Sequence, residues 1–308
     1  MKNVIITGAT SFIGVHLINE CIKNNCNVFA VVRPRSKNLL RIPNNKLIRI
    51  IELDKNEIDK ITKIISGIKI DAFYHLAWEG TRLPYRDNIK RQQNNYECAV
   101  KAINTCNELG CKKFIGVGSQ AEYGLCQGVV DENYPKNPNT EYGKYKLKAY
   151  NKLKKIAKEY NMNYIWIRVF SAYGVLDYEN TLIMSSLKKM LNNEPICMTK
   201  CTQKWNYINV EDVAKILYLF LERNCKNGAY NVASNYSMKL SEYVREMKKI
   251  CNSKSELKFG AIPYSSEGIR NLEPCIDKLI KNLNYEFTIT FEEGIKNILK
   301  SWNIEDFR

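Results

Sequence analysis

Histidine is scarce in this sequence, and the cysteines do not pair along the chain. His16 and His75 are the only histidines among 308 residues, and the eleven cysteines form no CxxC pair; Cys197 and Cys201 come closest. A structural zinc site needs clustered cysteine or histidine ligands, so we expect no metal site. The odd number of scattered cysteines indicates reduced thiols, most of them in the core.

Long apolar segments are also lacking. No window approaches the roughly 20 apolar residues of a membrane span. The first residues, Met1 to Thr7, do not show a charged region, an apolar stretch and a small-residue cleavage site in secretory order. We therefore expect a cytoplasmic protein without a membrane partner.

The net charge of +15 is not gathered into a basic arm. Lysines are dispersed along the whole chain, so a nucleic-acid partner is not expected. Two interpretations of the charge remain. It can be an ordinary solvated surface, or a positive field that favours phosphorylated substrates and cofactors.

Apolar segments rich in β-branched residues alternate with helical patterns along the first half of the chain. This order predicts an α/β fold: a doubly wound parallel sheet of the Rossmann type with helices on both faces. After about residue 170 the order is less regular, which indicates a dinucleotide-binding domain at 1–170 and a mainly substrate-binding α/β region at 171–308. The expected strands are 4–7, 28–32, 47–51, 72–76, 114–117 and 164–169, and the expected helices are 13–23, 89–109, 142–160, 181–192, 210–223 and 239–252.

The first expected strand runs into the segment "ITGATSFIG", which carries Gly8, Ser11 and Gly14. A strand, a tight glycine turn and a helix N-terminus form an anion site, because free backbone N–H groups and the helix dipole point at a pyrophosphate. Ser11 stands where the dinucleotide fingerprint has its middle glycine. Its small hydroxyl tolerates a close backbone approach and can donate to a phosphate.

The second expected strand lacks the acidic residue that binds a ribose 2′-hydroxyl in NAD sites. Arg33, Arg35 and Ser36 follow it instead. A guanidinium matches the 2′-phosphate of NADP, so NADP(H) is favoured and NAD is the alternative. Asp54 follows the third strand, where it can meet the adenine, and "YHLAWEG" (74–80) ends the fourth, where ligand crevices open in such sheets.

The segment "TEYGKYKLKAY" (140–150) holds three tyrosines and three lysines. Tyr142 and Lys146 are four apart and therefore share one helix face, whereas Tyr145 reaches Lys148 only at three. Such a pair fits either a catalytic acid with its lysine or the polar face of a helix.

Further motifs occur in a fixed order along the chain. They are "TGATSFIG" (7–14), "HLAW" (75–78), Asn95, "GVGSQAEYG" (116–124), "YGKYK" (142–146), "RVFSAYG" (168–174), "WNYINVEDVA" (205–214) and "FEEGIKNIL" (291–299). Together they resemble the extended short-chain dehydrogenase/reductase family, specifically its nucleotide-sugar epimerases, dehydratases and 4-keto reductases. The resemblance spans nearly the whole chain and is nearest to the 4-keto-6-deoxy sugar reductases.

The resemblance implies catalytic roles for three residues. Tyr142 would be the acid/base, Lys146 would contact the nicotinamide ribose and lower the pKa of the phenol, and Ser119 would orient the substrate oxygen. The implied cofactor contacts are Gly8, Thr10, Ser11, Phe12, Ile13, Gly14, Arg33, Arg35, Ser36, Asp54, Leu76, Ala77, Trp78, Asn95, Val117, Tyr142 and Lys146. The implied substrate contacts are Glu79, Gly80, Gln120, Ala121, Arg168, Ser171, Trp205 and Asn206.

Departures from the family pattern narrow the chemistry. Dehydratases carry an Asp and Glu pair directly after the serine or threonine, where this chain has Gln120 and Ala121. Glu122 lies one position further and points elsewhere if the strand end is regular. Many epimerases carry asparagine at the place of Ser171 and arginine at that of Trp205, so the commonest 4-epimerases match less well.

We therefore expect NADPH-dependent reduction of a nucleotide-linked 4-keto(-6-deoxy) sugar. An NAD-dependent nucleotide-sugar 4-epimerase uses the same three residues and is the alternative. A non-catalytic dinucleotide-binding protein is a more remote one. By resemblance the protein is also a homodimer, paired through the helices at 89–109 and 142–160.

Overall fold

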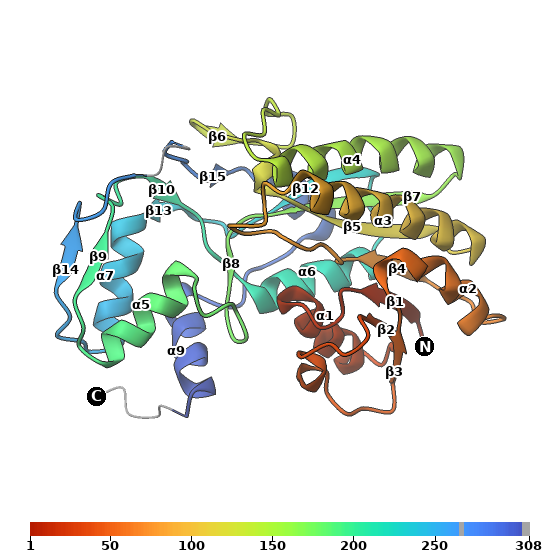
Figure 1. Ribbon diagram of the computed structural model, residues 1–308, viewed down its shortest axis with the longest axis horizontal. Helices are drawn as coiled ribbons and strands as arrows, with labels where there is room; N and C mark the ends of the chain where they lie inside the picture. Colours follow the sequence, from red (N-terminus) through yellow and green to blue (C-terminus); the bar gives the residue numbers. More distant parts are fainter. Residues whose placement is uncertain (265–267, 304–308) are drawn as a thin grey trace.

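The computed structural model describes residues 1–264 and 268–303. Within these residues, seven parallel strands form the central sheet (Figure 1). Their order across the sheet is β12-β7-β5-β4-β1-β2-β3, so the order reverses between β1 and β4. The strands are β1 (Asn3–Thr7), β2 (Asn27–Val32), β3 (Ile48–Glu52), β4 (Ala72–His75), β5 (Lys113–Ser119), β7 (Asn163–Val169) and β12 (Gly228–Val232). The predicted doubly wound fold is confirmed.

Alternating side chains on the strands build one core on each face of the sheet. On β1, Val4 and Ile6 belong to one core and Ile5 to the other. Because both faces are covered, the strands are apolar nearly throughout. The first face packs against α1 (Phe12–Lys23), α6 (Val210–Glu222) and α8 (Asp277–Leu283), and the second against α2 (Ile61–Ile64), α3 (Ile89–Glu108) and α4 (Glu141–Glu159).

A third core lies in the region after residue 170, beside the sheet in Figure 1. It joins α5 (Leu182–Leu191), α7 (Leu240–Ile250) and α9 (Phe291–Ser301), with Leu187, Tyr243 and Ile295 at its centre. The paired short strands are β6 (Val129–Val130) with β15 (Glu273–Pro274), β8 (Ala172–Tyr173) with β11 (Ile208–Asn209), β9 (Ile196–Met198) with β14 (Leu257–Phe259), and β10 (Lys204–Trp205) with β13 (Met238–Lys239).

The predicted helices and strands agree with the structure to within a residue or two at most ends. The seventh strand, β12, was not predicted, and it returns from the second region to the edge of the sheet beside β7. The second region therefore contributes β12, α6 and α8 to the main sheet, and a boundary near residue 170 stays a prediction. The cysteines carry free thiols, and most are buried, as predicted.

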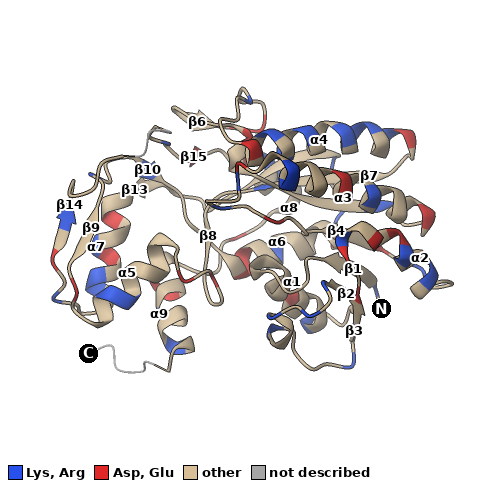
Figure 2. Cartoon of the chain, viewed as in Figure 1, with Lys and Arg blue, Asp and Glu red and all other residues tan. Residues whose placement is uncertain are grey.

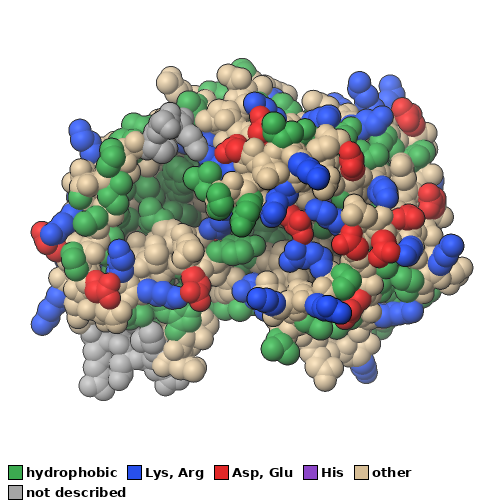
Figure 3. Space-filling view, viewed as in Figure 1, with side chains coloured by type: hydrophobic (Ala, Val, Ile, Leu, Met, Phe, Trp, Pro, Cys, Tyr) green, Lys and Arg blue, Asp and Glu red, His purple; other side chains and the backbone are tan. Residues whose placement is uncertain are grey.

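The arrangement leaves a hollow between the sheet and the third core. Figure 3 shows it as a recess lined largely by hydrophobic side chains. It lies at the carboxyl ends of the strands, next to the reversal between β1 and β4, where ligands bind in such sheets. Lysines and arginines are spread over both regions in Figure 2. No helix among the described residues is both long and apolar enough to cross a bilayer.

Candidate active site

The turn between β1 and α1 is tight because two glycines allow close backbone contacts. Gly8 has a φ of +69°, and a Cβ there would lie 2.8 Å from the backbone nitrogen of Ala77. A Cβ on Gly14 would collide with the carbonyl oxygen of Gly8. Ser11 caps α1, since its Oγ accepts the N–H of Gly14 at 3.1 Å. The hydroxyl at the middle position therefore fixes the helix N-terminus and keeps its own proton for another acceptor.

Two connected clefts open at this turn. The larger, about 560 Å³, lies between the sheet and the third core, and the smaller, about 150 Å³, lies beside Gly8 and β2. Ser11, Leu76, Trp78 and Tyr178 line both. An elongated ligand can therefore pass from one cleft to the other across the N-terminus of α1. The connected shape and the glycine turn fit a dinucleotide whose pyrophosphate meets the free N–H groups of that helix.

The wall of the smaller cleft carries a network of charges. The guanidinium of Arg33, after β2, lies 2.7 Å from Glu79, and the ammonium of Lys55, after β3, lies 3.0 Å from the same carboxylate. All three residues and Asp54 line this cleft. Glu79 was predicted to contact the substrate. The structure places its carboxylate in the smaller cleft, held by these two ion pairs, and Glu79 does not line the larger cleft.

Arg35 and Ser36, predicted to bind a 2′-phosphate, lie outside the residues that line the smaller cleft. Arg35 is exposed, at a φ of +55°, and the hydroxyl of Ser36 lies 3.3 Å from that of Thr10. Of Arg33, Arg35 and Ser36, only Arg33 lines the smaller cleft.

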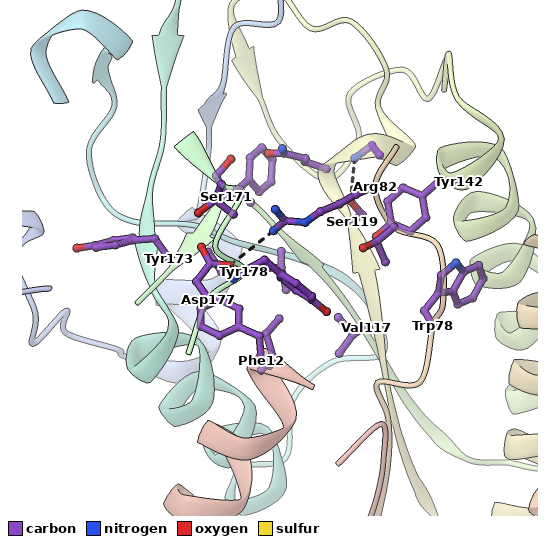
Figure 4. A pocket seen from close by; sticks show the side chains of 18 of the residues that line it. Phe12, Trp78, Arg82, Val117, Ser119, Tyr142, Ser171, Tyr173, Asp177 and Tyr178 are labelled. Carbon is purple, nitrogen blue, oxygen red and sulfur yellow. Dashed lines mark hydrogen bonds and ion pairs between the residues drawn. The ribbon is translucent and has the colours of Figure 1, made fainter. Parts of the chain in front are cut away.

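Ser119, Tyr142 and Lys146 meet in the larger cleft. Ser119 ends β5, and the other two lie on one face of α4, as the spacing predicts. Thr140 caps that helix by accepting the N–H of Gly143 at 3.1 Å, and a Cβ on Gly143 would collide with the carbonyl oxygen of Ala121. This close contact places the start of α4 against the segment that follows Ser119. Figure 4 shows Tyr142 and Ser119 side by side.

Lys146 is buried and held from two sides. Its ammonium donates to the carbonyl oxygen of Val117 at 2.6 Å and lies 3.8 Å from the centre of the Trp78 ring. Burial lowers the pKa of Lys146 to about 7, opposed by the negative charge of Glu122. The lysine is therefore poised between its charged and neutral forms near neutral pH.

The predicted lowering of the phenol pKa by Lys146 is not found. Burial raises the pKa of Tyr142 to about 12, and only hydrogen bonding to Ser119 and the charge of Arg82 oppose this. The physical reason is that the phenolate loses its hydration, while the ammonium of Lys146 is directed to Val117 and Trp78. Tyr142 is thus protonated at neutral pH and able to donate a proton.

Glu122 lies directly after Gln120 and Ala121 but points away from the cleft. Its buried carboxylate accepts the N–H of Ser119 and the indole N–H of Trp166, both at 2.9 Å. It also pairs with Nε of Arg168 at 2.7 Å. Arg168 was predicted to contact the substrate; instead it is fully buried as the partner of Glu122. Near Ser119 the cleft is lined by uncharged Gln120 and Ala121.

Two further residues that were predicted to contact the substrate line neither cleft. Asn206 is buried, and its amide donates to the carbonyl oxygens of Ser234 and Tyr236 at 3.1 Å and 2.7 Å, so it holds that turn in place. Gly80 lies outside the residues that line either cleft, and its carbonyl oxygen accepts the amide of Gln92.

The other predicted positions divide between the two clefts. Asn95 lines the smaller cleft, where its amide bonds both the backbone N–H and the carbonyl of Glu79. The larger cleft is also lined by predicted residues Phe12, Ile13, Val117, Ser171 and Trp205, and the smaller by Thr10, Asp54 and Ala77.

The sequence alone did not reveal a cluster of charges at the mouth of the larger cleft. Arg82, Arg86 and Arg270 line it together with Asp177. Nη2 of Arg82 lies 3.6 Å from Asp177, and its guanidinium stacks 4.6 Å from the centre of the Tyr178 ring. Figure 4 shows this arginine reaching across the cleft to the loop that carries Asp177. Arg82 and Arg86 both lie in the loop that follows β4, and this pair of arginines is the feature of the sequence that could have indicated the cluster.

Comparison with known proteins identifies the class. The chain belongs to the NAD dependent epimerase/dehydratase family, whose profile matches residues 4–233. It is 27% identical to CDP-abequose synthase of Salmonella muenchen and 26% identical to dTDP-4-dehydro-6-deoxyglucose reductase of Escherichia coli, each alignment covering 97% of both chains. The predicted family, and the prediction of an enzyme, are confirmed.

A solved structure shows the same fold. The UDP-N-acetylglucosamine 4-epimerase from Methanobrevibacter ruminantium M1, in complex with UDP-N-acetylmuramic acid, superimposes with a TM-score of 0.88 at 24% identity and covers 98% of both chains. Curated relatives of this chain include a reductase, an epimerase and a 4,6-dehydratase of nucleotide-linked sugars.

Proposed function

We propose that this protein reduces a nucleotide-linked 4-keto(-6-deoxy) sugar with NADPH. The observation that carries the proposal is the site around Ser119. Its hydroxyl, the protonated phenol of Tyr142 and the amine of Lys146 share a cleft that continues into the dinucleotide site, and uncharged Gln120 and Ala121 follow the serine there. This set can donate a proton to a carbonyl oxygen, but it lacks the carboxyl pair that dehydration needs.

The roles follow from the geometry. The bound nicotinamide would supply hydride to the ketone carbon. Tyr142 would give its proton to the ketone oxygen, and Ser119 would hold that oxygen in line. Lys146, anchored on Val117, would orient the cofactor's ribose. Burial favours the protonated phenol, which suits a proton donor.

The arginines at the cleft mouth support an anionic substrate. Arg82, Arg86 and Arg270 line the cleft, and the diphosphate of a nucleotide-linked sugar would lie against them. Arginine binds phosphate oxygens in pairs and so fixes orientation as well as charge. The relatives named for CDP-abequose and dTDP-4-dehydro-6-deoxyglucose support this substrate class.

The preference for NADPH rests on Arg33, which faces the smaller cleft without an acidic residue next to it in β2. One observation favours the second candidate, an NAD-dependent 4-epimerase: the charge of Arg33 is already paired with Glu79. We also infer a cytoplasmic homodimer, from the resemblance only.

The test is to denature the purified protein, identify any released nucleotide by chromatography, and titrate the emptied protein with NADPH and NADH. An empty site that binds NADPH, followed by NADPH oxidation with CDP- or dTDP-linked 4-keto-6-deoxyhexoses, supports the reductase. Stoichiometric NAD in the extract, with interconversion of UDP-sugar epimers and no net reduction, would replace it with the epimerase. If the protein binds a nucleotide but turns over none of these sugars, the non-catalytic dinucleotide-binding protein would replace both enzymes.

A further inference from the structure

The charged wall of the smaller cleft contains an acidic residue, Glu79, that is distant along the chain from the strand it faces. Strand β2 ends without a carboxylate, yet Glu79 from the loop after β4 brings one to the guanidinium of Arg33, 46 positions away along the chain. The carboxylate spans two cations, with one oxygen on Arg33 at 2.7 Å and the other on Lys55 at 3.0 Å. An internal anion thus already pairs with the two cations that a 2′-phosphate would use.

Glu79 is held in this position independently of its charge. Asn95, which is buried, accepts the backbone N–H of Glu79 at 3.2 Å and donates to its carbonyl oxygen at 2.8 Å. The side chain of Glu79 is about one-third exposed, at 31%, while that of Arg33 is 62% exposed. A ligand phosphate can therefore reach the guanidinium, but only in competition with the carboxylate.

Competition of this kind acts on a phosphate far more than on a hydroxyl. A 2′-phosphate carries about two negative charges, which Glu79 repels while it neutralises Arg33 and Lys55. A ribose hydroxyl is neutral and can donate to a carboxylate. Glu79 therefore weakens binding of a 2′-phosphorylated nucleotide to Arg33 and Lys55 and leaves binding of the unphosphorylated one nearly unchanged.

We propose that Glu79 is the residue that sets cofactor selectivity in this chain, by competing with the 2′-phosphate for Arg33 and Lys55 so that the site accepts both NADPH and NADH. The inference rests on the proposed function only in requiring a nicotinamide dinucleotide in this cleft. It does not depend on the sugar or on the reaction.

The test is equilibrium binding, without any sugar, to wild type and Glu79→Gln. Glutamine keeps the size of the side chain and the backbone bonds to Asn95 but removes the charge. The nucleotides are NADPH, NADH and the fragments 2′,5′-ADP and 5′-AMP, which lack nicotinamide. We expect Glu79→Gln to tighten NADPH and 2′,5′-ADP about tenfold, and to change NADH and 5′-AMP less than about threefold.

Two further variants define the cause. Glu57→Gln is the matched control, since it removes an exposed carboxylate paired with Lys60, in the same segment as Lys55 but outside the cleft. It should leave the ratio of NADPH to NADH affinity within about twofold of wild type. Arg33→Gln combined with Glu79→Gln should cancel most of the gain for NADPH, because the freed guanidinium is then absent.

An unchanged or lowered NADPH-to-NADH ratio in Glu79→Gln would overturn the inference. A gain that survives in the double variant would overturn the role of Arg33. The proposed function fails separately: if the expected shift in binding is measured but no 4-keto sugar is reduced, the selectivity residue stands and the reductase does not.

Discussion

The carboxylate of Glu122 and the guanidinium of Arg168 lie 2.7 Å apart in a fully buried ion pair, and the same carboxylate accepts the backbone N–H of Ser119 at 2.9 Å. A buried charge left without its partner is costly, because it is neither hydrated nor compensated. The pair therefore connects the stability of the sheet to the position of the candidate catalytic serine.

Glu122→Gln should lower the free energy of unfolding by roughly 3 kcal/mol, since it leaves the charge of Arg168 uncompensated and places an amide against its guanidinium. Urea unfolding measures this. Glu141→Gln serves as the control, because it breaks a pair with Lys144 in which the lysine is exposed and the glutamate partly exposed, and it should cost less than about 0.5 kcal/mol. A loss below about 1 kcal/mol for Glu122→Gln would show that the pair contributes little.

This ion pair also shows where prediction from sequence ends. The strands and helices were predictable because both faces of the sheet are covered and leave a nearly continuous apolar pattern in each strand. Strand β12 was missed because its sequence, GAYNV, contains glycine and asparagine, which are depleted in strands, and only one β-branched residue. The turn at Gly8 was predictable because the motif is local.

Side-chain direction was not predictable in the same way. Arg168 and Glu122 are 46 positions apart, as are Arg33 and Glu79, so neither pairing leaves a local pattern. Arg168 and Glu79 were assigned to the substrate by resemblance, and tertiary partners instead direct one into the core and the other to the smaller cleft. The positions of Ser119, Tyr142 and Lys146 in one cleft were predictable because each belongs to a motif at a strand end or on one helix face.

The buried amine of Lys146 predicts a pH-dependent cost to stability. Its pKa is lowered to about 7 in the folded protein, below that of an ordinary lysine, so the unfolded chain binds more protons between these values and stability rises with pH there. The cost is fully present below pH 7 and disappears as the pH approaches the ordinary lysine value. Lys146→Met should therefore stabilise the fold by roughly 1–3 kcal/mol at pH 6, and by less at pH 9.

Thermal or urea unfolding at the two pH values tests this, with Lys148→Met as the control. Lys148 is an exposed lysine on the same helix and should show no such difference between the two pH values. Equal effects of Lys146→Met at pH 6 and pH 9 would contradict the lowered pKa. The same variant should lose most of its reductase activity, since the amine faces the cleft.

Tyr142→Phe removes the proposed proton donor and little else. We expect kcat for reduction to fall by about 10²–10⁴, the usual contribution of a positioned acid, with the Kd for NADPH changed less than about twofold. Tyr145→Phe on the same helix is the control, because that residue lines neither cleft. Steady-state kinetics and a binding titration separate the two effects, and turnover within tenfold of wild type would exclude Tyr142 as the donor.

We expect replacement of Arg82 to weaken substrate binding, and replacement of its partner Asp177 to have little effect. Arg82→Met removes a guanidinium from the cleft and should raise KM for the nucleotide-linked sugar about tenfold, the scale of one charge-assisted phosphate contact. Asp177→Asn keeps the guanidinium, and its remaining oxygen can still accept the N–H of Tyr178, so KM should stay within about threefold.

Comparing these two variants distinguishes two roles of Arg82: binding the diphosphate of the substrate, or holding the loop of Asp177 across the cleft. If Arg82 mainly fastens the loop of Asp177 across the cleft, breaking the 3.6 Å contact from either side should raise KM to a similar extent. If it binds the diphosphate, Arg82→Met alone raises KM. Because Asp177 withdraws part of the charge of Arg82 from the cleft, its replacement could even lower KM, and that result would be the strongest sign that this guanidinium faces an anion.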